Sequence, residues 1–567
     1  MKRTIAPILV LACLAAGAAG AADRGKDERQ GVLKALEDEL ARSMDKLKTE
    51  DFSAPYFIAY TIRDTESVDI AGRFGAVTQS AANRGRNMHV DVRVGGYGFD
   101  NSSDKGDYDF SWSTGYRTPR SVPLDNDPLS IRNVFWLVTD EEYKAAQSAY
   151  LKKKGKGVYE VAEKDRPASF SREEKHVFVE PPAGWKFDAG RWEREVRTVT
   201  AMFKGHPGII DSSMKVTADT VTRYFVNSEG SALITGETLY SVGISAVARA
   251  EDGMLLDNTR TFYARSAAGL PDHAKLNRET SEMIAELLAL RNAPVLDPYH
   301  GPAILLPEAT GVLFHEAVGH RLEGERQNSE KEGQTFKGQL GKKVLPAMVT
   351  LVDDPTLAKW DGEALNGHYR YDEEGVPAQK VTLVEKGVLK NFLLSRKPIK
   401  GFEKSNGHGR AAPGYAPAAR MATLFVDAEE KIPYAELKRR LIEEVKRQGK
   451  SFGLILKNIS GGSTNTSTYG YQAFKGVPKL VYRVGLDGKE ELVRGVEMVG
   501  TPLASINKIM AVSDRFEVFN GFCGAESGYV PVSSISPAVL LKEIELQRVS
   551  KESEKPPLIP SPWAGGK

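Results

Sequence analysis

The chain has 567 residues, of which 41% are hydrophobic, 27% charged and 8% aromatic, a composition typical of a globular protein and not of a disordered or fibrous one. This length exceeds that of one compact core and suits two or three domains. Lys and Arg number 77 against 75 Asp and Glu, a net charge of +2, so the chain as a whole has no strong electrostatic attraction for nucleic acid.

The N-terminus has the pattern of an export signal. Lys2 and Arg3 precede an apolar stretch from Ile5 to Leu14, and the small residues Ala19-Gly20-Ala21 are typical of a cleavage site. We therefore assign residues 1–21 to a signal peptide that is cleaved after Ala21. Loss of Lys2 and Arg3 reduces the net charge from +2 to 0.

A membrane anchor and a lipoprotein acylated at Cys13 are two alternatives to a cleaved signal. The apolar run is short, rich in Ala and Gly, and followed by charged residues, which disfavours an anchor. No later segment reaches the roughly 18 uninterrupted apolar residues of a membrane-spanning helix. We expect an exported protein, periplasmic or secreted, that is soluble after the signal is removed.

The first half predicts helices and strands in turn. Apolar residues at three- to four-residue intervals predict an amphipathic helix over 27–47. A lysine-rich, charge-dense run follows a helical stretch within residues 141–175; we interpret it as a solvated surface insertion and, less favourably, as a nucleic-acid patch. The remaining predicted elements are strands at Pro55–Ile62, Val68–Val77, Met88–Val94, Val221–Val226 and Ala232–Val247, and helices at Trp192–Phe203 and Arg278–Arg291.

Three prolines between Ala293 and Pro302 indicate a domain boundary. Hairpin signals follow, with turns at Glu385-Lys386-Gly387 and Asp487-Gly488, and a helix is predicted over Tyr434–Lys446. We predict an α+β fold of two domains built largely on antiparallel sheets with flanking helices. The predicted parts after the signal are an N-terminal domain, a C-terminal domain and a mobile tail, at 22–295, 296–549 and 550–567.

The residues most suggestive of chemistry are His315, Glu316 and His320, in the segment LFHEAVGH. They form HExxxH, one residue longer than the HExxH motif in which two histidines hold zinc and the glutamate is the general base. In a regular α-helix, residues five apart differ by about 140° in azimuth. If both histidines bind one ion, the helix must be distorted, and we expect a π-bulge aided by Gly319. The alternative is two unrelated histidines.

A catalytic zinc needs a third protein ligand. Cys523 is a strong candidate because it is the only cysteine after the signal and lies between glycines, which indicates a loop. The alternative is that Cys523 is a small, buried hydrophobic residue without a metal. Glu323 and Glu325 are further candidates, and Glu323 could instead orient His320 from behind. The other histidines also remain open as the third ligand: His89, His176, His206, His273, His300, His368 and His408.

The second half resembles the TldD/PmbA family of metallopeptidases, historically called modulators of DNA gyrase. The resemblance covers about residues 300–545 and lies in HEAVGHRLEGE (315–325), YDEEGVPAQKVTLVEKGVLKNFLLS (371–395), SNGHGRAAPGYAPAARM (405–421), RGVEMVGTP (494–502) and NGFCGAESGYVPVSSISPAVLL (520–541). It implies that His315, His320 and Cys523 bind zinc and that Glu316 is the base. Arg410 could line the substrate cleft or have a structural role.

The resemblance also implies a function and partners. We expect a zinc-dependent peptidase that hydrolyses unfolded or extended peptides, acting as a homodimer or as a heterodimer with a zinc-free paralogue. The alternative is a non-catalytic, zinc-containing peptide-binding or scaffolding subunit, although a structural zinc site needs no adjacent base such as Glu316. A DNA-topology regulator conflicts with the export signal and the neutral charge.

Overall fold

The structure is a computed structural model that describes residues 27–48, 50, 52–102, 120–157, 166–182, 185–329, 335–464, 474–500, 502–549 and 562. The predicted signal peptide lies outside these residues, as does the predicted tail apart from Pro562. Within the described part of the chain, no helix has the length and apolar character needed to cross a bilayer. The export signal and the location that it implies therefore remain predictions.

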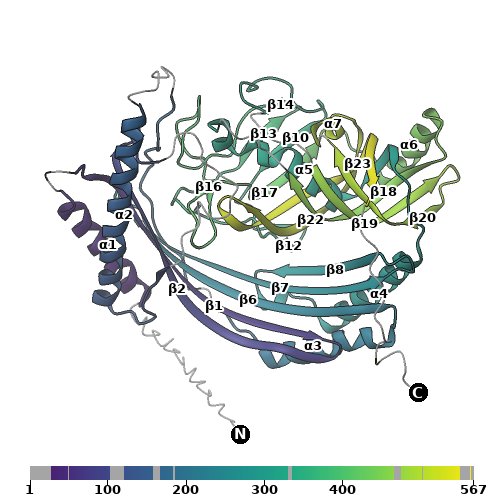
Figure 1. Ribbon diagram of the computed structural model, residues 1–567, viewed down its shortest axis with the longest axis horizontal. Coiled ribbons are helices and arrows are strands. Elements are labelled where there is room, and N and C mark those ends of the chain that lie inside the picture. Colours follow the sequence, from purple (N-terminus) through teal and green to yellow (C-terminus); the bar gives the residue numbers. More distant parts are fainter. Residues whose placement is uncertain are drawn as a thin grey trace, which may run out of the picture.

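The first half of the chain forms one long, curved sheet (Figure 1). Four helices accompany it: α1 (Arg29–Lys46), α2 (Pro128–Gly157), α3 (Ala189–Ala201) and α4 (His273–Asn292), with short 3₁₀ turns η1 (Met202–Gly205) and η2 (Ala267–Gly269). The strand order is β3 (Phe99–Asp100), β2 (Ala76–Gly96), β1 (Pro55–Arg73), β6 (Ile209–Asn227), β7 (Ala232–Arg249) and β5 (Val177–Val179), while β4 (Arg120–Ser121) pairs with β2 and β8 (Leu255–Ala264) with β7.

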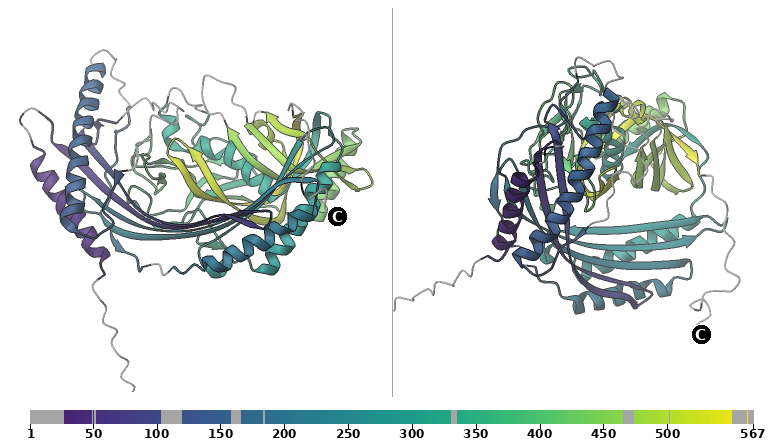
Figure 2. Two further views of the ribbon diagram at one scale, coloured as in Figure 1. Left: turned by 60° about the horizontal axis from the view of Figure 1, so that its bottom comes forward. Right: turned by 60° about the vertical axis from the view of Figure 1, so that its left-hand side comes forward.

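This sheet carries its helices on its outer side. Helices α1 and α2 cover one end through apolar residues such as Leu36 and Phe135, and α3 and α4 cover the other through residues such as Val196 and Leu287. Figure 2 shows the opposite, concave side turned toward the second half of the chain. Residues on that side are largely polar, for example Thr217, whose hydroxyl lies 2.6 Å from that of Ser241.

The predicted strand at Val68–Val77 is wrong in one respect. Residues 55–96 form a single long hairpin, and its turn falls at Phe74 and Gly75, which have φ of 44° and 78°. The predicted strand therefore spans the end of β1 and the start of β2. The lysine-rich run continues α2 to Gly157, and Lys152 and Lys154 within it are exposed.

The second half of the chain forms an eleven-stranded, mainly antiparallel sheet. Its strands are β9 (Tyr299–Leu305), β10 (Val349–Asp353), β13 (Val381–Glu385), β14 (Val388–Leu389), β17 (Thr423–Ala428), β18 (Phe452–Thr464), β19 (Phe474–Gly485), β20 (Glu490–Val493), β21 (Val496–Gly500), β22 (Ile509–Ala525) and β23 (Gly528–Arg548). Two small ribbons pair β11 (Lys359–Trp360) with β12 (Glu363–Ala364), and β15 (Gly409–Arg410) with β16 (Ala418–Ala419).

The helices of this half are α5 (Pro307–Ala317), α6 (Tyr434–Arg447) and α7 (Pro502–Ile506), with 3₁₀ turns η3 (Gly319–Leu322) and η4 (Gly324–Gln327). Helix α5 is apolar nearly all round, with Leu313 and Phe314 fully or almost fully buried, because it packs against β18, β22 and β23. A helix that is buried on most sides is held in a fixed position by its neighbours. The α+β prediction is confirmed, and α5 is the element that positions the site.

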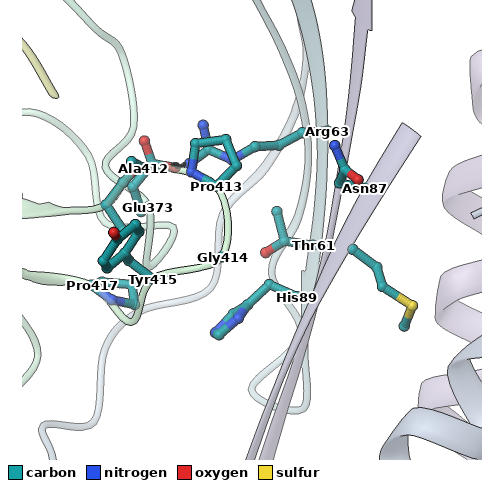
Figure 3. A pocket seen from close by; sticks show the side chains of 12 residues that line it. Thr61, Arg63, Asn87, His89, Glu373, Ala412, Pro413, Gly414, Tyr415 and Pro417 are labelled. Carbon is teal, nitrogen blue, oxygen red and sulfur yellow. Dashed lines mark hydrogen bonds and ion pairs between the residues drawn. The ribbon is translucent and has the colours of Figure 1, made fainter. Parts of the chain in front are cut away.

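Arginine contacts join the two halves. Arg63 of β1 makes an ion pair of 2.6 Å with Glu373 and donates to the carbonyl of Ala411 at 3.1 Å. Figure 3 shows Arg63 and Glu373 beside a pocket where the segment 411–417 passes β1 and β2. The pocket measures about 30 Å³, room for about one water molecule, so we regard it as part of the contact between the halves.

Candidate metal centre

His315 and His320 reach the same point because the helix ends between them. Helix α5 stops at Ala317, Val318 has φ of −120° and ψ of −49°, and η3 begins at Gly319. The expected π-bulge is therefore wrong: a break followed by a 3₁₀ turn produces the change of direction. The centroids of the two imidazole rings lie 5.0 Å apart.

Gly319 has a different role from the predicted one. Its φ is not in the left-handed region, so backbone freedom is not what the position requires. A Cβ atom there would lie 2.0 Å from Sδ of Met421. The glycine is needed because the segment that carries Met421 packs directly against the turn before His320.

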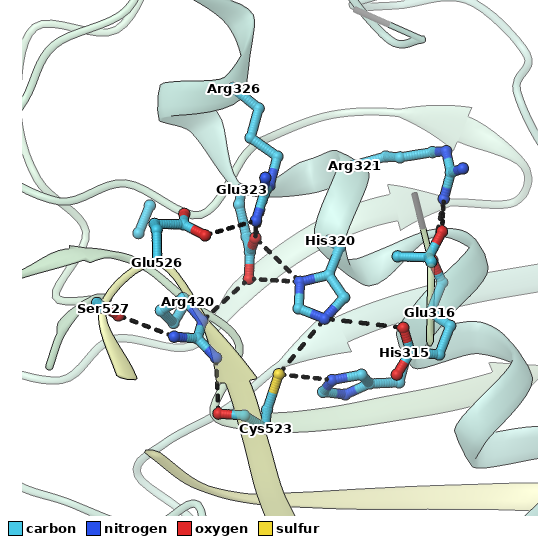
Figure 4. Close-up of polar contacts among 12 residues, drawn as sticks. His315, Glu316, His320, Arg321, Glu323, Arg326, Arg420, Cys523, Glu526 and Ser527 are labelled. Atoms are coloured by element: carbon cyan, nitrogen blue, oxygen red, sulfur yellow. Dashed lines mark hydrogen bonds and ion pairs between the residues drawn. The ribbon is translucent and has the colours of Figure 1, made fainter. Parts of the chain in front are cut away.

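Cys523 joins the two histidines from β22, near the end of the β22–β23 hairpin. The prediction that it lies in a loop is wrong, since it is paired with Val530 of β23. Its Sγ lies 3.1 Å from Nε2 of His315 and 3.4 Å from Nε2 of His320 (Figure 4). Among the residues that the structure describes, these are the one group of three or more His, Cys, Asp or Glu side chains close enough to share an ion, with ligand atoms within 4.8 Å of one another.

The donor atoms fit a zinc ion. Two imidazole nitrogens and one sulfur are the ligand types that zinc prefers, and three protein ligands are the number found at catalytic zinc sites. Burial by itself raises the pKa of the Cys523 thiol, but His320, Arg420 and His315 outweigh it and hold that pKa well below its ordinary value. A metal-binding cysteine must be deprotonated, so this environment favours the ligating form.

Glu323 orients His320 from the side away from Cys523. Its two carboxylate oxygens each lie 3.1 Å from Nδ1 of His320, so Nδ1 carries the hydrogen and Nε2 is left as a lone-pair donor. Burial raises the pKa of Glu323, but His320 and Arg326 lower it more, to about 2. Glu323 is therefore an ionised partner of His320 and does not reach the ion position itself.

Glu316 lies on the open side of the cluster. Its Oε2 is 3.9 Å from Nε2 of His320, the nitrogen that faces Cys523. His315, Glu316, His320 and Cys523 all line a cleft of about 420 Å³. A carboxylate beside the donor atoms and open to a cleft can accept a proton from a water molecule there.

The other candidate residues are used elsewhere. Glu325 accepts hydrogen bonds from Ser395 and from the backbone amide of Ala419 at 3.0 Å. Arg410 is buried, donates to the carbonyl of Met421 at 2.7 Å and lies over the ring of Tyr369, so it does not line the cleft. The remaining histidines do not join the group formed by His315, His320 and Cys523.

Arg326 and Arg420 are the functional residues that the sequence did not single out. Both guanidinium groups are buried and both contact Glu323. The only sequence signal is that Arg420 lies in the segment 405–421 and Arg326 directly follows the segment 315–325.

Comparisons with known proteins agree with this site. Residues 298–548 match the family described as the PmbA/TldA metallopeptidase C-terminal domain. A metalloprotease of Archaeoglobus fulgidus is 33% identical over 270 residues, which is 47% of this chain and 58% of the relative. A metalloprotease of Methanothermobacter thermautotrophicus is 29% identical over 59% of this chain and 69% of the relative. A TldD homologue of Haemophilus influenzae is 30% identical over 45% of this chain and 51% of the relative.

Solved structures show the same fold. A putative modulator of DNA gyrase from Thermotoga maritima has a TM-score of 0.60 at 15% identity and covers 90% of this chain and 99% of its own. TldE from Thermococcus kodakarensis has a TM-score of 0.60 at 14% identity and covers 90% of this chain and 100% of its own.

The site and the named relatives together indicate a protein of the metallopeptidase class. More particularly, the second half of the chain, residues 298–548, is a domain of the TldD/PmbA family.

Proposed function

We propose that this protein is a zinc-dependent peptidase that hydrolyses unfolded or extended peptides. The observation that carries the proposal is the convergence of His315, His320 and Cys523 within 4.8 Å, with Glu316 beside them on a cleft. One relative, from Saccharolobus solfataricus and 23% identical, bears the name zinc metalloprotease. A zinc ion held by the three ligands would supply Lewis-acid chemistry, polarising a carbonyl and lowering the pKa of water.

The residues of this chain have distinct parts in that reaction. Glu316 accepts the proton of the attacking water at its carboxylate and later delivers it to the leaving amine. Glu323 keeps Nδ1 of His320 protonated and the ring in place. The buried position of His320 and Cys523 excludes water from one side of the site, which strengthens electrostatic interactions there.

The surface near the cluster suits an extended chain. Phe522 and Tyr529 line the cleft and are 50% and 60% exposed, and the ring of Phe522 lies 6.1 Å from that of Tyr263 in the sheet of the first half. Exposed aromatic rings of this kind bind apolar parts of a ligand. We further propose that the protein is exported and acts as a homodimer or beside a zinc-free paralogue.

The test is metal content and peptide cleavage by the purified full chain. Mass spectrometry of the metal should find one zinc per chain, and a fluorescently labelled, denatured protein should be cleaved, with loss of cleavage after chelation and recovery on adding zinc. A chain that binds no stoichiometric zinc would overturn the proposal. A chain that binds zinc and captures peptide without cleaving it would instead favour the scaffolding role.

A further inference from the structure

We propose that Arg420 is a positioning residue that holds the two separate parts of the metal centre in register. The inference rests on the proposed function, because it assigns Arg420 to the same zinc site. Arg420 lies directly after β16, far in sequence from both η3 and β22, and its side chain is completely buried. It contacts both parts of the site but cannot itself bind a metal ion, because a guanidinium is positively charged and has no acceptor atom.

One side of the Arg420 guanidinium faces the histidine part of the site. Its Nε lies 3.5 Å from Oε1 of Glu323, the carboxylate that accepts from Nδ1 of His320. The ion pair therefore fixes a group that itself fixes a proposed ligand. This contact is an ion pair and not a hydrogen bond, and it adds to the contacts that Glu323 makes with His320 and Arg326.

The other side of the guanidinium faces the cysteine part. Nη2 donates to the carbonyl of Cys523 at 2.8 Å, and Nη1 donates to Oγ of Ser527 at 2.8 Å and to the carbonyl of Gly528 at 3.0 Å. Figure 4 shows this arrangement, with Arg420 between the hairpin and Glu323. The tip of the β22–β23 hairpin is thus tied to the same group as His320.

Arg326, in η4, makes a second connection between Glu323 and the β22–β23 hairpin. It donates to Glu323 at 2.8 Å and pairs with Glu526 of the hairpin at 3.0 Å. Arg420 adds a hydrogen bond to the backbone carbonyl of Cys523 itself. Arg420 is the member of this network that reaches the backbone of one proposed ligand on one side and the carboxylate that orients another on the other side.

Arginine is the residue type that this geometry requires. A planar guanidinium has five N–H donors in a fixed fork, and a lysine ammonium has three on a shorter, compact group. Arg420→Lys keeps the positive charge but cannot reach Glu323, Cys523 and Ser527 together. The variant should therefore loosen the spacing between His320 and Cys523 while leaving every proposed ligand in the chain.

The experiment measures metal binding by the full-length chain with Arg420→Lys. Zinc affinity, from competition with a chromophoric chelator, should fall about 10- to 100-fold, the usual cost of losing an outer-sphere partner. With cobalt in place of zinc, the sulfur-to-cobalt absorption should shift or weaken. The matched control is Arg86→Lys, a buried arginine on β2 in the first half that pairs with Asp64, which should leave both readouts unchanged.

A second variant covers the case in which Arg420→Lys does not fold. Ser527→Ala removes one acceptor of Arg420 and no proposed ligand, and it should lower zinc affinity by a smaller factor in the same direction. Wild-type affinity and a wild-type cobalt spectrum in the folded variants would overturn the role of Arg420. Absence of metal from the wild-type chain would instead overturn the proposed function, so the two failures are distinguishable.

Discussion

The second half of the molecule contains two buried histidine clusters that differ in what their ring nitrogens contact. In the first, Nδ1 of His320 faces Glu323 and Nε2 faces Sγ of Cys523 at 3.4 Å beside the cleft. In the second, His408 is completely buried. Its Nδ1 lies 3.0 Å from two oxygens of Asn406, and its Nε2 lies 3.4 Å from Oδ1 of Asp353.

The difference separates a proposed ligand from a structural residue. Both histidines have a neighbouring glycine and an acidic partner, so neither feature identifies a metal ligand. Both nitrogens of His408 are occupied by oxygen acceptors, and Asp353 also accepts from the backbone amides of Ala422 and Thr423. His320 has one nitrogen oriented by a carboxylate and the other turned toward a sulfur atom, which is the arrangement that binds metal.

The largest expected effect is the loss of metal from His320→Ala. Removing a proposed ligand should reduce zinc affinity by more than the roughly 10- to 100-fold seen for outer-sphere partners, so the purified variant should lack stoichiometric zinc. His408→Ala should keep one zinc per folded chain. Metal analysis of both variants checks the contrast, and one zinc in His320→Ala would remove the distinction between the clusters.

Glu316→Gln should separate binding from cleavage. Because Gln cannot accept a proton from water, cleavage of a labelled, denatured protein should fall about 10²- to 10⁴-fold, the usual contribution of a general base. Zinc content and the melting temperature should change little, since Gln has nearly the shape of Glu and the variant keeps His315, His320, Cys523 and Glu323. Cleavage at the wild-type rate would exclude Glu316 as the base.

Much of the fold could be predicted from local pattern. The predicted helix over Tyr434–Lys446 is α6 (Tyr434–Arg447), and the turn at Asp487-Gly488 joins β19 to β20, because amphipathic spacing and turn residues act over short distances. The hairpin turn at Phe74 was missed because Phe is rare at positive φ and apolar residues continue on both sides of it.

The candidate residues of the site could also be found from sequence, but their geometry could not. HExxxH does not reveal that α5 ends at Ala317, because the end depends on packing: Met421, a hundred residues away, lies where a side chain at Gly319 would be. Arg326 and Arg420 were missed for a related reason. The sequence does not indicate which arginines are buried. Only the folded chain shows that Arg326 and Arg420 both contact Glu323.

His408→Ala should affect stability more than the site. The change leaves a cavity in place of a buried ring and removes one contact of the buried Asp353, which together should cost about 2–5 kcal/mol of unfolding free energy. Urea denaturation followed by circular dichroism measures the change. His300→Ala is the control, because His300 is 60% exposed, and a surface substitution should stay within about 0.5 kcal/mol. Equal stability of the two variants would show that the second cluster has no structural role.

The smallest expected effect concerns a carboxylate outside both clusters, on the concave sheet of the first half. Burial, and then the nearby charge of Asp69, raises the pKa of Asp219 from 3.8 to about 6, although Lys215 lowers it. A carboxyl whose pKa is higher in the folded state costs stability when it ionises, so this cost appears as the pH rises from about 4 to 6.

Asp219→Asn should therefore raise the melting temperature slightly at pH 7.5 and leave it unchanged near pH 3.5. Differential scanning calorimetry at the two pH values checks the sign. Asp211→Asn, on the same strand, is the control: the side chain of Asp211 is 45% exposed and pairs with Arg73 at 3.1 Å, so its substitution should not raise the melting temperature. A lower melting temperature for Asp219→Asn at pH 7.5 would mean that ionised Asp219 stabilises the sheet, in the way that Glu323 stabilises the metal centre.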